Sequence, residues 1–261
     1  MKQQLFDVQE LPLAELQKIG LAQNGLISLK EDDLQALLAG RRTGMLRLEN
    51  LTGDGMHIPM IDAKLSFKRN AQGNMDMLLH PIYKEATYPE YLTDVEAEKL
   101  QNGTAVNIEK VVTDKEGHRQ DILIEYDPET REFIITDSEK ILVPDMVNNE
   151  FLSLEQRERY KKGKEVQLAD GTVFQYSGTD KKGMVSNKLA LVASLIVDGG
   201  LSYILYKGLN ALLNKKRDEK EAASFSLGYE QAVSDMNENK MFTEQSKAQK
   251  ADQQHYRRTG R

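Results

Sequence analysis

The chain has 261 residues, a formal net charge of −6 and no cysteine. The lack of cysteine excludes disulfide bonds, thiolate nucleophiles and zinc sites built on cysteine. The acidic balance provides no general attraction to nucleic acid or to anionic lipid. The first residues lack the apolar core of a secretory signal, so we expect a protein in the cytoplasm or at the cytoplasmic face of the inner membrane.

A leucine followed after ten residues by a glycine occurs three times, at 29–40, 92–103 and 152–163. Thr93 and Ser153 are favourable N-cap residues in the second and third copies, and acidic residues follow in the first turn of all three. The closing glycines suit the position just after a helix, where φ is positive. Each copy therefore predicts a helix of about three turns, and the repetition predicts an array of small modules.

Strand-like patterns follow each predicted helix. After the second copy they cover residues 105–113, 121–126 and 132–136, with turn residues between them. The first copy continues in the same way, whereas the third turns into an apolar segment at 188–213 where another strand is due. A helix followed by a small antiparallel meander predicts an α+β fold made of repeated modules.

These patterns divide the chain into four predicted parts. Residues 1–88 and 89–148 each form a helix with a β-meander, and residues 149–213 form a third module that ends in an apolar helical hairpin or anchor. Residues 214–261 are polar, and we expect a flexible tail that contains at most one short helix on a weak apolar stripe. The stripe consists of Phe225, Leu227, Tyr229 and Val233.

The apolar segment at 189–213 is the exception in this polar chain, and lysines flank it on both sides. Its length approaches that of a bilayer-spanning helix, but Asp198 and the glycine pair after it disfavour a continuous span. Three alternatives stay open. They are a buried or self-associating helical hairpin bent at Asp198-Gly199-Gly200, a membrane-inserted or interfacial helix, and a core helix ending at Val197 before a second short helix.

We predict interaction residues in and before this segment, because exposed apolar surface of that size normally marks a partner or a membrane. They are Asp198, Gly199, Gly200, Tyr203, Lys181 and Lys182. A protein partner or a homo-oligomer is expected, with the membrane as an alternative. A basic patch at 255–261 is compatible with phosphate contacts and keeps nucleic acid as a further alternative.

No pattern of catalytic residues emerges. The histidines His57, His80, His118 and His255 are scattered singly and form no metal-binding pair. Residues 178–183 have the glycine spacing of a phosphate-binding loop, but methionine and valine follow where that chemistry needs lysine and serine or threonine. A carboxylate pair that meets only in the fold would escape this search. We predict no catalytic residue, no metal site and no cofactor, and we expect an interaction protein rather than an enzyme.

Two parts of the chain resemble paired families of unknown function from conjugative transposons of anaerobic gut bacteria. Residues 10–21 and 34–43 are similar to the first family, and residues 91–213 are similar to the second. The second resemblance rests on the motifs at 92–103, 152–166, 176–183 and 198–203. It implies a role in conjugative transfer or DNA processing and assigns no catalytic residue. In that setting Arg41-Arg42 and the arginines of the tail would suit a DNA-associated factor.

Together these observations predict a non-enzymatic accessory protein of a mobile genetic element. It would associate with itself or bind a partner through residues 189–213, and its modules would offer sheet surfaces to that partner. A membrane-anchored accessory protein, with the same residues inserted in the bilayer, is the alternative.

Overall fold

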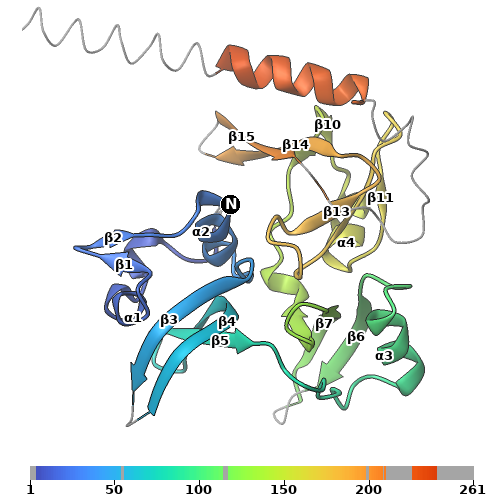
Figure 1. Ribbon diagram of the computed structural model, residues 1–261. Coiled ribbons are helices and arrows are strands. Elements are labelled where there is room, and N and C mark those ends of the chain that lie inside the picture. Colours follow the sequence, from blue (N-terminus) through green and yellow to red (C-terminus); the bar gives the residue numbers. More distant parts are fainter. Residues whose placement is uncertain are drawn as a thin grey trace, which may run out of the picture.

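The computed structural model describes residues 4–53, 56–113, 117–197, 200–207, 209 and 225–239. It confirms an α+β fold in which short helices alternate with small antiparallel sheets (Figure 1). The chain starts with short elements that precede the first repeat. They are η1 (Val8–Glu10), α1 (Leu13–Lys18), β1 (Ala22–Gln23) and β2 (Leu26–Ile27).

Each of the three repeat helices is followed by a three-stranded antiparallel meander. The helices are α2 (Glu31–Leu38), α3 (Asp94–Gln101) and α4 (Leu154–Lys161). The first two meanders are β3 (Leu46–Gly53), β4 (Met56–Arg69) and β5 (Met75–Pro81), then β6 (Ile108–Thr113), β7 (Arg119–Asp127) and β8 (Glu132–Asp137). The third is β11 (Val166–Gln167), β12 (Val173–Tyr176) and β13 (Met184–Ser186). The prediction that the third copy lacks its last strand is therefore wrong, because the short β13 completes it.

The end signals of the repeat act as predicted. Thr93 and Ser153 each accept a hydrogen bond from the backbone N–H three residues later, as part of a capping box. Gly40, Gly103 and Gly163 follow the three helices with φ of +75°, +74° and +63°, which favours glycine. The periodic leucine and glycine therefore mark three similar helix ends.

Ser153→Ala is expected to lower the free energy of unfolding by about 1 kcal/mol, because the backbone N–H of Gln156 loses its acceptor at the start of α4. Lys30→Ala is the matched control, since Lys30 holds the N-cap position of α2 without a side-chain hydrogen bond. Urea unfolding followed by circular dichroism measures both variants. Equal losses would show that the Ser153 hydroxyl does not act as a cap.

The apolar segment forms a β-hairpin, so each of the three predicted helical forms is wrong over 190–197 and 200–207, the part of the segment that the structure describes as strands. β14 (Ala190–Val197) and β15 (Gly200–Lys207) pair from Ala190↔Lys207 to Val197↔Gly200. β14 also pairs with β9 (Met146–Val147), which pairs with β10 (Glu150–Phe151), and the sheet order is β10-β9-β14-β15. In the described ranges no helix has both the length and the apolar character needed to cross a bilayer.

Burial of both faces of β14 explains its sequence. Leu191 and Ala193 belong to the largest core cluster, whereas Ala190 and Val192 pack against a helix at 227–239. A strand that is covered on both faces carries a continuous apolar run, and periodicity cannot distinguish such a run from a buried helix.

The helix at 227–239 lies within the predicted tail. Ser226 caps it by accepting a hydrogen bond from the Tyr229 backbone N–H at 3.1 Å, and Tyr229 and Ala232 pack against β14. The short helix expected from the apolar stripe of the predicted tail is thus present. The basic patch at 255–261 lies outside the described residues.

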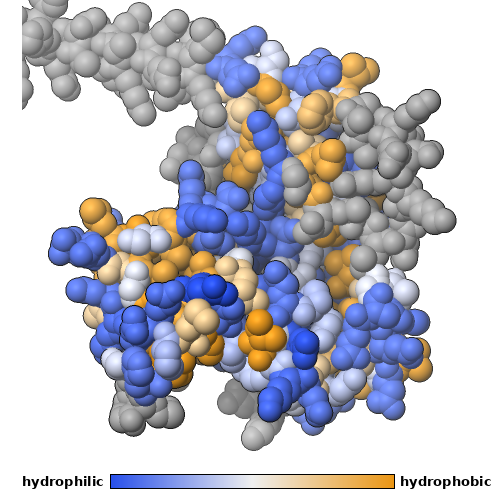
Figure 2. Space-filling view, viewed as in Figure 1, coloured by the Kyte–Doolittle hydropathy of each residue, from blue (hydrophilic) through white to orange (hydrophobic). Residues whose placement is uncertain are grey.

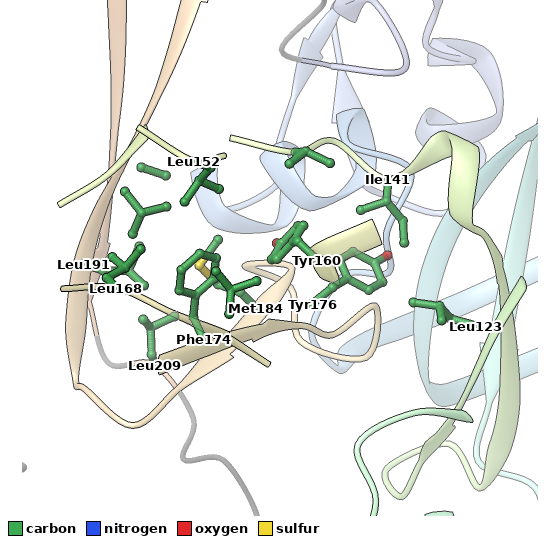
Figure 3. Packing of buried hydrophobic residues seen from close by; sticks show 14 residues of the cluster. Leu123, Ile141, Leu152, Tyr160, Leu168, Phe174, Tyr176, Met184, Leu191 and Leu209 are labelled. Carbon is green, nitrogen blue, oxygen red and sulfur yellow. The ribbon is translucent and has the colours of Figure 1, made fainter. Parts of the chain in front are cut away.

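The largest core cluster joins the third module to the hairpin and to the second module (Figure 3). Tyr160 of α4 packs between Phe174 and Tyr176, with ring centroids 5.7 and 5.9 Å apart. Leu191 comes from β14, and Leu123 comes from the face of β7 that is turned away from α3. The second and third modules therefore share one core.

Buried ion pairs join the first module to the second. Lys64 of β4 lies 2.8 Å from Asp127 at the end of β7, and their side chains are 3% and 1% exposed. Arg42 contacts Glu132 at 2.7 Å and donates a hydrogen bond to Thr130 at 3.2 Å. Because buried charges are stable only when paired, these contacts fix the two modules relative to each other.

Candidate functional site

A cavity of about 450 Å³, here termed the junction cavity, lies where α2 approaches β15 and the loop 176–183. The surface between the N-terminal and C-terminal parts is mostly hydrophilic (Figure 2). The charged lining residues are Glu31, Asp32, Arg41, Lys181 and Lys182, and the aromatic ones are Tyr160, Tyr176, Tyr203 and Tyr206.

The structure brings together three of the six predicted interaction residues. Tyr203, Lys181 and Lys182 all line the junction cavity. Gly200 begins β15 and pairs with Val197 through the backbone register. Asp198 and Gly199 lie outside the described residues.

Arg41 connects the first module to the loop 176–183. Its guanidinium donates to the carbonyl oxygen of Lys181 at 3.2 and 3.3 Å. It also lies against Gly183, where an added Cβ would come within 2.9 Å of the guanidinium carbon. In the other direction, the Lys181 ammonium lies 3.6 Å from Asp33 and 3.8 Å from Asp32 on α2. Charges on both partners thus hold the loop to α2.

The loop 176–183 surrounds a buried carboxylate of the second module. Glu125 of β7 is 0% exposed. It accepts hydrogen bonds from the Gly178 backbone N–H at 2.6 Å, from the Ser177 hydroxyl at 2.9 Å and from the Thr179 backbone N–H. A Cβ on Gly178 would lie 2.8 Å from Glu125 Oε2. The loop with the glycine spacing of a phosphate site therefore binds an internal carboxyl group.

Burial controls the protonation of this region. It raises the pKa of Glu125 to about 7, although the hydrogen bonds from Gly178, Ser177 and Thr179 act in the opposite direction. Burial also raises the pKa values of Tyr160 and Tyr176 above the ordinary value of a tyrosine. Their hydroxyls therefore stay protonated at neutral pH, and they suit hydrogen bonding and packing rather than nucleophilic or base chemistry.

The junction cavity lies along β15 and also reaches Ala193 of the neighbouring strand β14. Four consecutive residues of this strand, 203–206, line it. Because successive side chains of a strand point to opposite faces, a cavity against one face would be lined by every second residue. β15 ends its sheet, and no strand in the described part of the chain pairs with its outer edge. The Lys207 carbonyl oxygen at the end of β15 accepts a hydrogen bond from Lys182 Nζ. The unpaired edge before it can accept a further strand.

Within the described ranges, no group of three His, Asp or Glu side chains is arranged to hold a metal ion. His80 contacts the Ser66 hydroxyl at 2.8 Å and Glu132 at 3.4 Å, and burial together with Arg42 lowers its pKa. His57 and His118 are exposed, and His255 lies outside the described residues.

Comparison with known protein families gives a match over the first third of the chain. Residues 6–90 match a family described as "Protein of unknown function (DUF4099)", which covers η1 through the end of the first meander. No curated protein matches the chain, and no solved structure matches it. The predicted resemblance to a family of unknown function is confirmed for the first module, whereas the mobile-element setting stays a prediction.

Proposed function

We propose that the protein is a non-enzymatic accessory protein of a mobile genetic element, located in the cytoplasm, that binds a protein partner through residues 189–213. The observation that carries the proposal is the unpaired edge of β15 along the junction cavity. An extended partner segment adds to this edge by main-chain hydrogen bonds, and the cavity receives its side chains.

The lining of the cavity supports a binding role. Tyrosine and arginine are enriched among the side chains that dominate interface energies, and four tyrosines and Arg41 line this cavity. Lys181, Lys182, Glu31 and Asp32 line the same cavity, which provides charges of both signs for selecting a partner.

The rigid setting of the cavity is a second support. The cavity lies between the first and third modules. Buried ion pairs hold the first module to the second, and a shared core holds the second to the third. A preformed site loses less conformational entropy on binding than a site that must be ordered. The setting in conjugative transfer or DNA processing rests on the sequence resemblance alone.

A photo-crosslinking side chain at Ile204 is expected to form an adduct with another protein in cells that carry the whole element. Ile204 lies on β15, lines the junction cavity and is 37% exposed. Ile196 on β14 is the matched control, because it is 44% exposed, belongs to the same hairpin and does not line the cavity. Denaturing electrophoresis and mass spectrometry measure the yield and the identity of the adduct.

The proposal also predicts that Lys181→Glu reduces the yield at Ile204 without changing the yield at Ile196. An adduct between two copies of this chain would show that the site binds a second copy of the chain and not a different protein. Equal yields at the two positions would contradict a binding site at the edge of β15.

A further inference from the structure

A second cavity, of about 500 Å³ and here termed the basic cavity, lies between the first and second modules. One wall consists of the consecutive residues 66–69 of β4 together with Leu78 and His80 of β5. The opposite wall is β8. Arg41 lines this cavity as well as the junction cavity, so the two sites are neighbours.

The basic cavity follows the outer edge of β8. Five consecutive residues, 133–137, line it. Successive side chains of a strand point to opposite faces of its sheet. As at β15, a cavity that contacts residues of both faces therefore lies along the edge of the strand. β8 is the last strand of its sheet, and within the described ranges no strand pairs with its outer side.

The lining is cationic although the whole chain is acidic. The cations are Arg41, Arg42, Lys68, Arg69 and Lys140, whereas the described residues contribute one acidic side chain to the lining, that of Asp137. Some of these charges are already paired, since Arg42 contacts Glu132 and Arg69 contacts Glu10 at 2.7 Å each. Lys68 pairs with no acid of the described residues, and Lys140 pairs with Asp137 while 68% exposed. Lys68 is therefore available to an anionic partner, and Lys140 can exchange its solvent-exposed pair with Asp137 for one with that partner.

Apolar side chains accompany the cations. Ile135 of β8 is 47% exposed and Leu78 of β5 is 39% exposed, and both line the basic cavity. An extended segment whose acidic and apolar residues alternate would complement both features, because alternate side chains of a strand point in opposite directions.

We propose that the basic cavity binds an extended acidic segment of a partner protein, which adds as a strand to the outer edge of β8 and directs carboxylates at Lys68 and Lys140. The proposal concerns a different strand edge from the proposed function and does not depend on it. The unpaired edge favours a peptide over a nucleic acid, because a phosphodiester backbone offers no N–H donors to a strand.

The test uses the full-length protein and fluorescence anisotropy with labelled probes. The first probe is a short peptide of alternating glutamate and valine. The second has the same sequence with N-methyl groups on every other residue, which keeps the charges and blocks strand pairing. A lysine–valine peptide and a single-stranded oligonucleotide complete the set. We expect binding of the first probe only.

Charge reversal by Lys68→Glu with Lys140→Glu is expected to weaken binding of the acidic peptide roughly tenfold or more. Lys99→Glu on α3 is the matched control, because Lys99 is exposed and lines neither cavity. The neutral pair Lys68→Gln with Lys140→Gln should give a smaller loss, and circular dichroism verifies that each variant is folded.

Three results would overturn the proposal. Equal affinity for the N-methylated peptide would exclude pairing with β8. If the oligonucleotide binds and the peptide does not, and the Lys68 and Lys140 variants weaken that binding, the basic cavity is a nucleic-acid site. No binding of any probe would remove the site altogether. Since the Ile204 crosslink reports on the other cavity, failure of one proposal is distinguishable from failure of the other.

Discussion

Lys64→Met is expected to lower the free energy of unfolding by about 3–5 kcal/mol. The substitution removes the partner of Asp127, whose side chain is 1% exposed, and leaves an uncompensated carboxylate between two modules. Arg42 lies 3.7 Å from Asp127 and already pairs with Glu132. It can therefore neutralise the charge of Asp127 only in part. Denaturant unfolding at neutral pH measures the loss.

The same sheet offers a control for this prediction. Arg47 and Asp62 form an ion pair between β3 and β4 at 2.9 Å, with side chains that are 60% and 35% exposed. Because water screens such a pair, Arg47→Met should leave the unfolding midpoint almost unchanged. If the two methionine variants unfold at the same denaturant concentration, burial does not determine the strength of the Lys64 pair.

A double variant distinguishes the cost of an unpaired buried charge from a specific requirement for the Lys64–Asp127 ion pair. Lys64→Met with Asp127→Leu removes both buried ions, and apolar packing should recover most of the loss seen with Lys64→Met alone. A double variant as unstable as the single one would show that the modules need this ion pair specifically. In that case the pair determines how the first module docks on the second.

The repeat was the most predictable part of the fold. Thr93 and Ser153 supply capping oxygens, and Gly103 and Gly163 supply the positive φ that ends a helix, so these signals act within a few residues. Local chemistry of this kind does not depend on tertiary context, which explains why the three helices could be predicted. The first two meanders carry alternating patterns and were also predictable, whereas the short last strand of the third was not.

The hairpin β14–β15 could not be predicted from periodicity, because both faces of β14 are buried. Two other signals favoured strands: the β-branched residues near Val192 and the Asp198-Gly199 pair between two apolar runs, which is a hairpin signature. The apolar length of the segment favours a membrane helix only when these two signals are left aside.

The site residues that the sequence missed act across modules. Glu125 sits in an ordinary alternating strand, and only the fold brings the loop 176–183 around it. Arg41 was considered for DNA contact, whereas in the structure it binds the Lys181 carbonyl oxygen. Ser226 was detectable, because it precedes apolar residues at 229, 232, 233 and 236 with helical spacing.

The stability of the protein is expected to fall by about 3 kcal/mol between about pH 5 and pH 8 because of Glu125. Its pKa is raised from the ordinary 4.5 to about 7 in the folded protein. Between these values the folded state binds the proton more tightly than the unfolded state. The contribution is therefore fully present below the unfolded pKa and is lost as the pH rises through the folded pKa.

Glu125→Gln isolates this contribution. The amide imitates the protonated carboxyl, since its oxygen can accept from the Gly178 N–H while its nitrogen donates to the Ser177 hydroxyl oxygen. The variant should show no corresponding loss over the same pH range. His80 has a lowered pKa and acts in the opposite direction, but it titrates in both proteins and cancels in their difference. Urea unfolding across the range gives the two curves.

Parallel curves would show that Glu125 is ionised in the folded protein throughout the range. The three donors from Ser177, Gly178 and Thr179 would then outweigh the cost of burial, and the loop 176–183 would act as a full anion site. Diverging curves would mean that burial dominates and that the loop holds a neutral carboxyl in acid and an anion in base. Because Tyr176, Lys181 and Gly183 of this loop line the junction cavity, the second result would also predict pH-dependent crosslinking at Ile204.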